Sequence, residues 1–422
     1  MDYFHSVTLD ADRCKGCITC VKRCPTEAIR VKNGKATIIK ERCIDCGECI
    51  RVCPHHAKKA VFDRLDQLDQ FEYKVALPAP ALFGQFNNLE NLDFVLNGLL
   101  DLGFDDVFEV ARAAELVSEC TRKRLSEPGC PKPLISSACP AIVRLIRVRF
   151  PKLIPHLLMV RAPIEIAAGI ARREAIEKTG LSSEQIGIFF VSPCPAKVTA
   201  ARQPLGTNIS GIDGVLAISD VYKPLLNAMN KIEQPKPLSE CGLTGISWAY
   251  TGGEATSLLR NRYLAADGME NVIKILEEIE DDKLMDLDFV ELGACNSGCV
   301  GGCLNIENPY IALTRIRQVR KYLPVSNNRI KDFSLPLESY FFDKTIEYDP
   351  VLQLDTDLGR AFQKMQEIQK FEKQLPGIDC AACGAPSCHT FAVDVINGNA
   401  NISECLILLN KTKKENDENE RS

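Results

Sequence analysis

Two cysteine runs near the N-terminus constrain the fold of this 422-residue chain more than any other feature. In each run, at residues 14–25 and 43–54, two residues separate the first cysteine from the second and the second from the third. Three residues then separate the third cysteine from a fourth, which proline follows directly. This is the doubled pattern in which the fourth cysteine of each run ligates the cluster of the other run, and its spacing does not suit a pair of zinc sites. We predict one [4Fe–4S] cluster on Cys14, Cys17, Cys20 and Cys53, and a second on Cys43, Cys46, Cys49 and Cys24.

The composition supports iron–sulfur chemistry. The chain has 20 cysteines but five histidines, which favours all-thiolate iron–sulfur sites over mixed zinc sites. A net charge of −5 argues against a nucleic-acid partner. No apolar run approaches the ~20 residues that span a membrane, and residues 1–6 do not start a secretory signal. We therefore expect a cytoplasmic protein without membrane insertion, in which clustered cysteines bind metal.

The chain reads as an α/β and α+β multidomain protein. Residues 1–62 are predicted to form a ferredoxin-like domain with two [4Fe–4S] clusters. Residues 70–355 alternate apolar strand candidates with helical stretches, as in an α/β domain. Residues 356–410 form a small C-terminal domain, and 411–422 a disordered tail. Strands are expected at 73–77, 134–137, 186–192 and 287–292, and helices at 92–102, ending at Gly103, and at 358–375.

The C-terminal domain carries its own cysteine set. Four thiols close on one site, with Gly384 and Pro386 shaping the loop, and we predict a third accessory [4Fe–4S] cluster. This part resembles the small cluster domain of membrane electron-transfer complexes and corrinoid iron–sulfur proteins. His389 is expected to be a surface residue or to donate a hydrogen bond near the site. The predicted ligands are Cys380, Cys383, Cys388 and Cys405.

Three more cysteines, Cys139, Cys194 and Cys295, each follow a predicted strand, where ligands of open α/β sheets bind. Proline follows the first two, which predicts that each lies at a helix N-terminus, where thiolate is favoured. Cys299 lies four residues beyond Cys295, either one helical turn on or across a tight glycine-rich loop. We predict that these cysteines form a fourth four-thiolate set. Buried apolar thiols are one alternative, and a radical-type cluster motif is another, although Cys303 comes one residue late for it.

Taken together, these motifs resemble those of the [FeFe]-hydrogenases. The resemblance extends from the ferredoxin domain to about residue 310, and it includes Gly103-Phe-Asp-Asp-Val-Phe-Glu and Tyr250-Thr-Gly-Gly253. The three cysteine motifs are Ser136-Ser-Ala-Cys139-Pro140, Ser192-Pro-Cys194-Pro-Ala-Lys197 and Glu291-Leu-Gly-Ala-Cys295-Asn-Ser-Gly-Cys299-Val-Gly-Gly.

The resemblance implies an H-cluster, in which a [4Fe–4S] cluster shares one cysteine with a diiron subcluster that bears CO, cyanide and a dithiolate amine. Cys299 matches the bridging thiolate. Lys197 matches the lysine that holds a cyanide, and a cation suits an anionic ligand in a dry site. The backbone around Pro193 and Pro140 is expected to line the same pocket. The remaining cluster ligands are Cys139, Cys194 and Cys295.

The chain departs from efficient family members along the proton path. Ala138 replaces the cysteine that shuttles protons to the diiron amine. Because positioned acid–base groups contribute about 10²–10⁴ in rate, we predict slow turnover. The other positions on this path are Ala200 in place of a glutamate, Leu158 or Met159 in place of a serine, and Cys120 beside Glu119 in place of an acid. Beside the diiron site, Ser192 and Gly293 replace methionines.

The same alanine and a C-terminal cluster occur together in the sensory branch of the family. The resemblance therefore implies a low-activity, hydrogen-sensing, anaerobic [FeFe]-hydrogenase that converts H2 reversibly into protons and electrons. Three accessory clusters would pass electrons to a redox or signalling partner protein, because the chain has no sensory or kinase domain of its own. Dedicated hydrogenase maturation proteins would assemble the diiron subcluster.

Two alternatives stay open. One is an ordinary catalytic hydrogenase with another proton route, through Cys120 or Cys303, although packed free thiols are the simpler interpretation of both. The other is a non-catalytic hydrogenase-like protein of iron–sulfur assembly or electron transfer. The complete ferredoxin domain, the C-terminal motif and Lys197 count against it. Cys130 and Cys241 are interpreted as structural.

Overall fold

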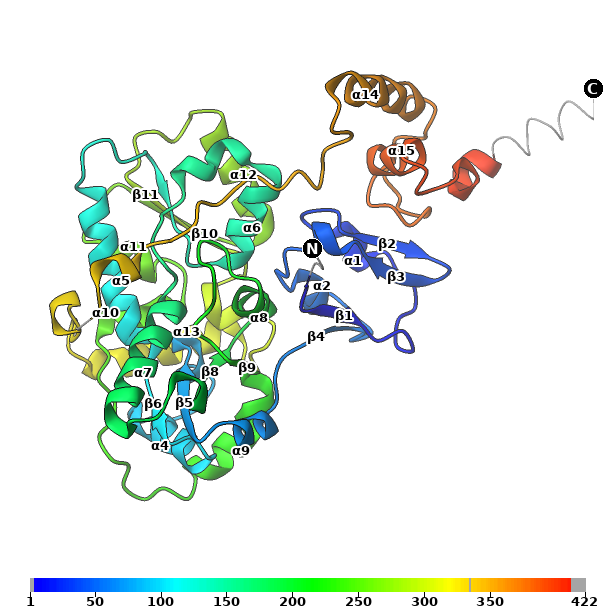
Figure 1. Ribbon diagram of the computed structural model, residues 1–422. Helices are drawn as coiled ribbons and strands as arrows, with labels where there is room; N and C mark the ends of the chain where they lie inside the picture. The colour runs from blue at the N-terminus through cyan, green and yellow to red at the C-terminus, as the bar shows by residue number, and fades with distance from the viewer. Residues whose placement is uncertain (1–3, 334, 411–422) are drawn as a thin grey trace, which may run out of the picture. The chain divides into compact units, whose positions relative to one another are not determined.

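The computed structural model describes residues 4–333 and 335–410 (Figure 1). The chain forms two compact units. The first contains Met1–Ile44, Glu48–Ala60 and Asp349–Ser422, and the second contains Asp45–Gly47 and Val61–Tyr348. The first unit therefore combines the predicted ferredoxin segment with the predicted C-terminal segment, from opposite ends of the sequence.

The N-terminal part of the first unit contains two small antiparallel sheets. β1 (Val7–Leu9) pairs with β4 (Lys58–Ala60), and β2 (Ile29–Lys32) pairs with β3 (Lys35–Ile38). Asn33-Gly34 joins β2 to β3 with φ angles of 51° and 71°, as a tight two-residue hairpin requires. Two short helices, α1 (Thr19–Lys22) and α2 (Glu48–Arg51), lie within the cysteine runs.

The C-terminal part of the first unit is a pair of helices, α14 (Leu358–Glu372) and α15 (Cys388–Ile396). Ile368 of α14 is buried, and the rings of Phe371 and Phe391 lie 6.4 Å apart between the two helices. The helix predicted from the apolar spacing at 358–375 is confirmed, with its end at Glu372. The apolar face of α14 thus packs on the helix that begins at a predicted cluster ligand.

The second unit contains two parallel sheets, with strand orders β6-β5-β8-β9 and β10-β11-β7. All seven residues of β8 are buried, as expected for a central strand covered on both faces. The strands are β5 (Tyr73–Pro78), β6 (Asp106–Val107), β7 (Leu134–Ile135), β8 (Ile186–Ser192), β9 (Gly214–Ala217), β10 (Tyr263–Asp267) and β11 (Phe289–Gly293).

Helices follow most of these strands, which is the α/β pattern predicted from the sequence (Figure 1). In the described part of the chain, no helix is long and apolar enough to cross a membrane. The helices of the second unit are α3 (Pro80–Phe83), α4 (Asp93–Asp101), α5 (Val110–Leu125), α6 (Pro140–Arg149), α7 (Pro163–Thr179), α8 (Pro195–Arg202), α9 (Ile218–Met229), α10 (Leu243–Ile246), α11 (Gly253–Ser257), α12 (Met269–Glu280) and α13 (Pro309–Val319).

The predicted elements agree with the structure except at their ends. The strands at 73–77 and 186–192 are β5 and β8. The strand at 134–137 is shorter, because β7 ends at Ile135, and the strand at 287–292 begins at Phe289. The helix at 92–102 is α4, and Gly103 follows it with a φ of 104°, as predicted for a glycine at a helix C-terminus. The tail predicted at 411–422 lies outside the described residues.

Candidate active site

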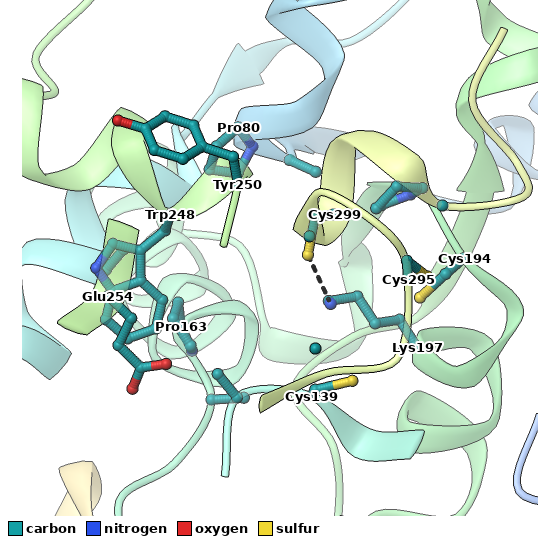
Figure 2. Close-up of a pocket in the computed structure, with 18 of the residues that line it drawn as sticks. Pro80, Cys139, Pro163, Cys194, Lys197, Trp248, Tyr250, Glu254, Cys295 and Cys299 are labelled. Atoms are coloured by element: carbon teal, nitrogen blue, oxygen red, sulfur yellow. Dashed lines mark hydrogen bonds between the residues drawn. The ribbon is translucent and has the colours of Figure 1, made fainter. Parts of the chain in front are cut away.

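Four cysteines line one cavity of about 110 Å³ in the second unit (Figure 2). Cys139 follows β7 and is the N-cap of α6, and Cys194 follows β8 and is the N-cap of α8. Cys295 and Cys299 come from the loop that follows β11. The helix N-termini predicted from the two prolines are therefore confirmed, and three distant segments bring their thiols to one place.

The glycine-rich loop after β11 explains how Cys299 reaches Cys194. A Cβ on Gly302 would lie 2.2 Å from the carbonyl oxygen of Pro193, the residue before Cys194. Backbone therefore lies directly on backbone, and a side chain does not fit. Gly298–Gly301 forms a single 3-10 turn. Of the two predicted possibilities, the tight loop is the one observed.

Lys197 extends from the first turn of α8 into the cavity. Its Nζ lies 3.9 Å from the Sγ of Cys299 (Figure 2), and the residue is 8% exposed. Burial acts to lower the pKa of Lys197, but the cavity sulfurs in their ionised, metal-binding form, chiefly Cys299 and Cys194, raise it above its ordinary value. Lys197 therefore stays cationic beside these sulfur atoms.

The thiols of the cavity are suited to a metal rather than to a free ionised state. Burial raises the pKa of Cys194 to about 12, although Lys197 opposes the shift. Burial also raises the pKa of Cys299. Without metal these thiols are protonated at neutral pH, whereas a bound metal displaces their protons. The four cavity thiols and one buried cation fit an anionic iron–sulfur cluster.

In the first unit, the predicted ligands of the first ferredoxin-type cluster lie together. Cys14, Cys20 and Cys53 share one core cluster. Burial raises the pKa of Cys20, and the charges of Cys17, Cys53 and Cys14 add to that shift. Backbone N–H groups of Ala36 and Ala57 point at the Sγ atoms of Cys14 and Cys53, at 3.4 and 3.3 Å, as is typical of cluster thiolates.

The second ferredoxin-type set stays a prediction. The backbone N–H of Ala28 lies 3.2 Å from the Sγ of Cys24, so this sulfur also has a backbone donor. Cys43, Cys46 and Cys49 are half-buried.

The predicted C-terminal ligands Cys380, Cys383, Cys388 and Cys405 all line one small cavity. Burial raises the pKa of Cys383, and the charges of Cys405 and Cys380 add to the shift. His389 is exposed, and its Nδ1 lies 2.9 Å from Glu372 Oε2. Four thiols at one cavity fit a cluster here too, and His389 is a surface residue.

Ala138 lines the thiol cavity and also a second cavity of about 50 Å³. Ala200 lines the second cavity as well, so both positions where the family carries a proton-transfer group present methyls there. Pro193 and Gly293 line the thiol cavity, whereas Pro140 lines the second one.

Cys120 and Cys303 are not among the described residues that line either cavity. Burial raises the pKa of Cys120 to about 12, which makes it a poor proton carrier at neutral pH. Leu158 is buried and Met159 half-buried, and neither lines these cavities. The substitute proton routes considered from the sequence gain no support from these positions.

Two carboxyl groups that sequence reasoning missed line the thiol cavity: Glu254 and Glu291. Ser136 Oγ donates to Glu254 Oε2 at 2.6 Å, while Glu254 Oε1 is buried without a hydrogen-bond partner. The Glu291 oxygens accept from the backbone N–H groups of Gly252 and Ala255 at 2.8 and 2.7 Å. Figure 2 shows Glu254 on the side of the cavity opposite Lys197.

Both carboxyl groups hold protons more tightly than usual. Burial raises the pKa of Glu254 well above its ordinary value, and the charge of Glu291 adds to the shift. Burial also raises the pKa of Glu291, to about 7. The sequence carried one signal for the second of these: Glu291 is an acid inside the apolar run Phe289-Val-Glu-Leu, where strand residues are otherwise apolar.

A family model described as "Iron only hydrogenase large subunit, C-terminal domain" matches residues 72–263 and 254–303. A second model, "4Fe-4S dicluster domain", matches residues 6–54, and a third, for an Fe-S cluster segment, matches residues 375–407. The three matches include both ferredoxin cysteine runs, the four cysteines of the thiol cavity and the four C-terminal cysteines.

Proteins of two kinds, a hydrogenase and an iron–sulfur cluster assembly factor, are similar to this chain in sequence. The chain is 28% identical over 294 residues to the periplasmic [Fe] hydrogenase large subunit of Nitratidesulfovibrio vulgaris, covering 63% of this chain and 70% of that one. It is 23% identical over 251 residues to a probable cytosolic Fe-S cluster assembly factor of Drosophila grimshawi, covering 46% and 53%. A solved variant of [FeFe]-hydrogenase HydA1 from Chlamydomonas reinhardtii has the same fold, with a TM-score of 0.52, 18% identity, and coverage of 68% and 98%.

Proposed function

Because the chain belongs to the family of iron-only hydrogenase large subunits, we propose that it slowly converts H2 into protons and electrons, and back, at the thiol cavity. The observation that carries this proposal is the meeting of four cysteines from three segments around the buried cation of Lys197. The proposed physiological role is hydrogen sensing.

The cavity residues fit an H-cluster. Cys139, Cys194, Cys295 and Cys299 would hold its [4Fe–4S] part, and Cys299 would bridge to a diiron subcluster with CO, cyanide and a dithiolate amine. When bound, this group supplies the metal site at which H2 is split or formed. Lys197 would donate a charge-assisted hydrogen bond to a cyanide. The backbone at Pro193 would line the group, as Pro193 lines the cavity.

Glu254 is well placed to hold the proton that the methyl of Ala138 cannot carry. Its Oε1 lies in the buried wall of the cavity without a protein partner, which favours an ordered water at this position. Its Oε2 is bound to Ser136, whose Oγ also accepts from the backbone N–H of Ala138 at 3.2 Å. We assign Glu254 as proton donor and acceptor on the cavity side of Ala138, with Glu291 as the second acid.

Slow turnover suits a sensor. The second cavity presents methyls at Ala138 and Ala200, so proton transfer by the family's usual route is lost there. Electrons would leave through the accessory clusters to a redox or signalling partner protein, and dedicated maturation proteins would supply the diiron subcluster. The proposed location is the cytoplasm, where a reducing medium keeps this many cysteines available for metal.

One alternative function follows from the relatives named as iron–sulfur assembly factors: a non-catalytic role without a diiron subcluster. The position of Lys197 favours the hydrogenase. A buried lysine beside cluster thiols requires an anionic partner. The cluster is one such partner, and a cyanide next to Cys299 would be a second.

The test is infrared spectroscopy of anaerobically purified, maturase-treated protein, first under argon and then under hydrogen. We expect bands of metal-bound CO and cyanide that shift under hydrogen. Filled [4Fe–4S] sites without such bands would instead support the non-catalytic alternative. Once bands are seen, the turnover rate separates a sensor from an ordinary hydrogenase.

A further inference from the structure

A buried ion pair joins the two ends of the sequence within the first unit. Arg30 Nε lies 2.5 Å from Asp394 Oδ2, and Arg30 Nη2 lies 3.2 Å from Asp394 Oδ1. The two residues are 5% and 6% exposed. Arg30 Nη1 also donates to the carbonyls of Glu27 and Ile29, so the guanidinium is well satisfied. A charge pair of this kind holds its two segments in one fixed geometry.

The backbones of the two segments also meet. Val31, in β2, donates its N–H to the carbonyl of Gly384 at 3.0 Å, on the edge of β2 that β3 leaves open. A Cβ on Gly384 would lie 2.0 Å from the Val31 carbonyl oxygen, and the φ of Gly384 is +83°. Only glycine allows this approach. The loop that carries Cys383 therefore lies directly against the ferredoxin segment.

Further side chains join the two segments, and we call this set of contacts the joint. Lys22 Nζ donates to the carbonyls of Asp379 and Pro386, at 2.7 and 3.0 Å. Thr390 Oγ1 donates to Glu27 Oε2 at 2.8 Å. These contacts fall close to predicted cluster ligands on both sides. Lys22 lies midway between Cys20 and Cys24, and Asp379, Gly384, Pro386 and Thr390 each lie within two residues of Cys380, Cys383 or Cys388.

We propose that this joint is an electron-transfer contact, across which the C-terminal cluster exchanges one electron directly with the ferredoxin cluster that includes Cys24. In each transfer one [4Fe–4S] cluster is oxidised from the +1 to the +2 state and the other is reduced from +2 to +1, with no proton or bond change. The C-terminal cluster is then an extension of the ferredoxin chain. This inference deepens the proposed electron path, but it rests on the accessory iron–sulfur sites and not on hydrogen chemistry.

The charges at the joint suit this role. Reduction adds one negative charge to a cluster, and nearby cations favour the reduced form. Lys22 and Arg30 supply two cations between the two sets of ligand loops, and Asp394 balances Arg30. Four contacts of the joint, made by Val31, Lys22 and Thr390, involve residues within two positions of a predicted C-terminal ligand, which a joint that served only to hold the segment would not require.

Electron paramagnetic resonance of the fully reduced, full-length protein tests the proposal, because each reduced cluster carries an unpaired spin and neighbouring spins split each other's signals. A Cys405→Ala variant, which lacks only the C-terminal cluster, gives the spectrum of the remaining clusters. We expect the wild-type spectrum to contain a further splitting that this variant lacks. A wild-type spectrum equal to the sum of independent clusters would overturn the proposal.

Variants at the joint sharpen this test. Gly384→Val forces the loop away from Val31, and Arg30→Glu sets two carboxylates against each other; whichever retains full iron and sulfide is used. We expect the extra splitting to be lost and reoxidation of the C-terminal cluster to slow. Glu367→Gln, at an exposed position of α14, is the matched control and should leave both unchanged. Unchanged splitting in a filled joint variant would also overturn the proposal, whether or not the protein turns over hydrogen.

Discussion

Ala138 lines both the thiol cavity and the second cavity, and the two cavities differ in the groups that could accept or donate a proton. In the thiol cavity, Glu254 presents an unpartnered oxygen and is bound to Ser136. In the second cavity, Ala200 presents a methyl group, and the one carboxylate, Glu165, has both oxygens occupied by Ser210 Oγ and the N–H of Gly211, at 2.7 and 3.0 Å. Burial raises the pKa of both acids, so burial alone does not distinguish them.

The difference lies in free hydrogen-bonding capacity. A buried oxygen without a partner can accept or give up a proton through a water, whereas a carboxylate whose two oxygens each have a fixed donor, such as Glu165, is less able to do so. Glu291 is held in the same way, but its pKa of about 7 lets it exchange a proton near neutral pH. Without the thiol of the family's usual proton path, the site therefore still has an acid. This acid is Glu254, which lines the thiol cavity together with Ala138.

Cys299→Ser removes the thiolate that we propose holds the diiron subcluster, the site to which both cavities would deliver protons. We expect the largest effect from this variant. Serine oxygen is a poor ligand for iron in a cluster and for a bridge to a second metal. The CO and cyanide bands should be absent and hydrogen turnover should fall to the background of the assay. Cys303→Ser, at a thiol that does not line the cavity, is the matched control and should keep the bands. Persistence of the bands in Cys299→Ser would remove the bridging assignment.

Glu254→Gln keeps the shape of the side chain but removes its titratable proton. We expect hydrogen turnover to fall by about 10²–10⁴, the usual contribution of a positioned acid–base group, with the infrared bands retained. Glu165→Gln in the second cavity should change turnover little. Equal loss in both variants would contradict the difference between the cavities, because it would indicate that any buried carboxyl here acts through the fold.

The cluster sites were predictable because their ligands follow one another closely in sequence. Intervals of three, three and four residues define the runs at 14–24 and 43–53, and proline after Cys139 and Cys194 predicted the two helix N-termini. The convergence of these thiols with Cys299 was also predictable, from the rule that parallel strands place their carboxyl ends at one edge.

The acids and the joint were not predictable in the same way. Glu254 has its partner 118 residues away, at Ser136, and Arg30 has its partner 364 residues away, at Asp394. No local periodicity or spacing records such pairs. What the sequence did show, the missing thiol at Ala138 and a missing acid near Glu119, pointed to Cys303 and Cys120 as substitutes, because another thiol was sought as the proton carrier. In the structure, one buried polar atom without a hydrogen-bond partner in the thiol cavity belongs to a carboxyl group instead, Oε1 of Glu254.

Glu291→Gln tests the second acid through pH. Burial raises the pKa of Glu291 to about 7, so its carboxyl is protonated below that pH and ionised above it. Hydrogen oxidation needs a proton acceptor, and its rate should therefore rise as pH increases through about 7 and then level off. We expect Glu291→Gln to flatten this step, which is worth roughly tenfold or less in rate, since Glu254 remains. A step that persists in the variant would assign the titration to another group.

Ala138→Cys is expected to change hydrogen turnover least among these variants. The size of this change indicates directly which of the two cavities supplies the protons. A thiol at position 138 would face a second cavity in which Ala200 still presents a methyl group, so it would have no partner from which to take a proton. We therefore expect at most a few-fold gain in hydrogen turnover, well short of the ~10²–10⁴ of a complete relay. The double variant Ala138→Cys/Ala200→Glu restores both groups on that side and should gain more than the single variants combined. A large gain from Ala138→Cys alone would mean that the missing thiol limits the rate by itself, and that Glu254 already delivers protons as far as position 138.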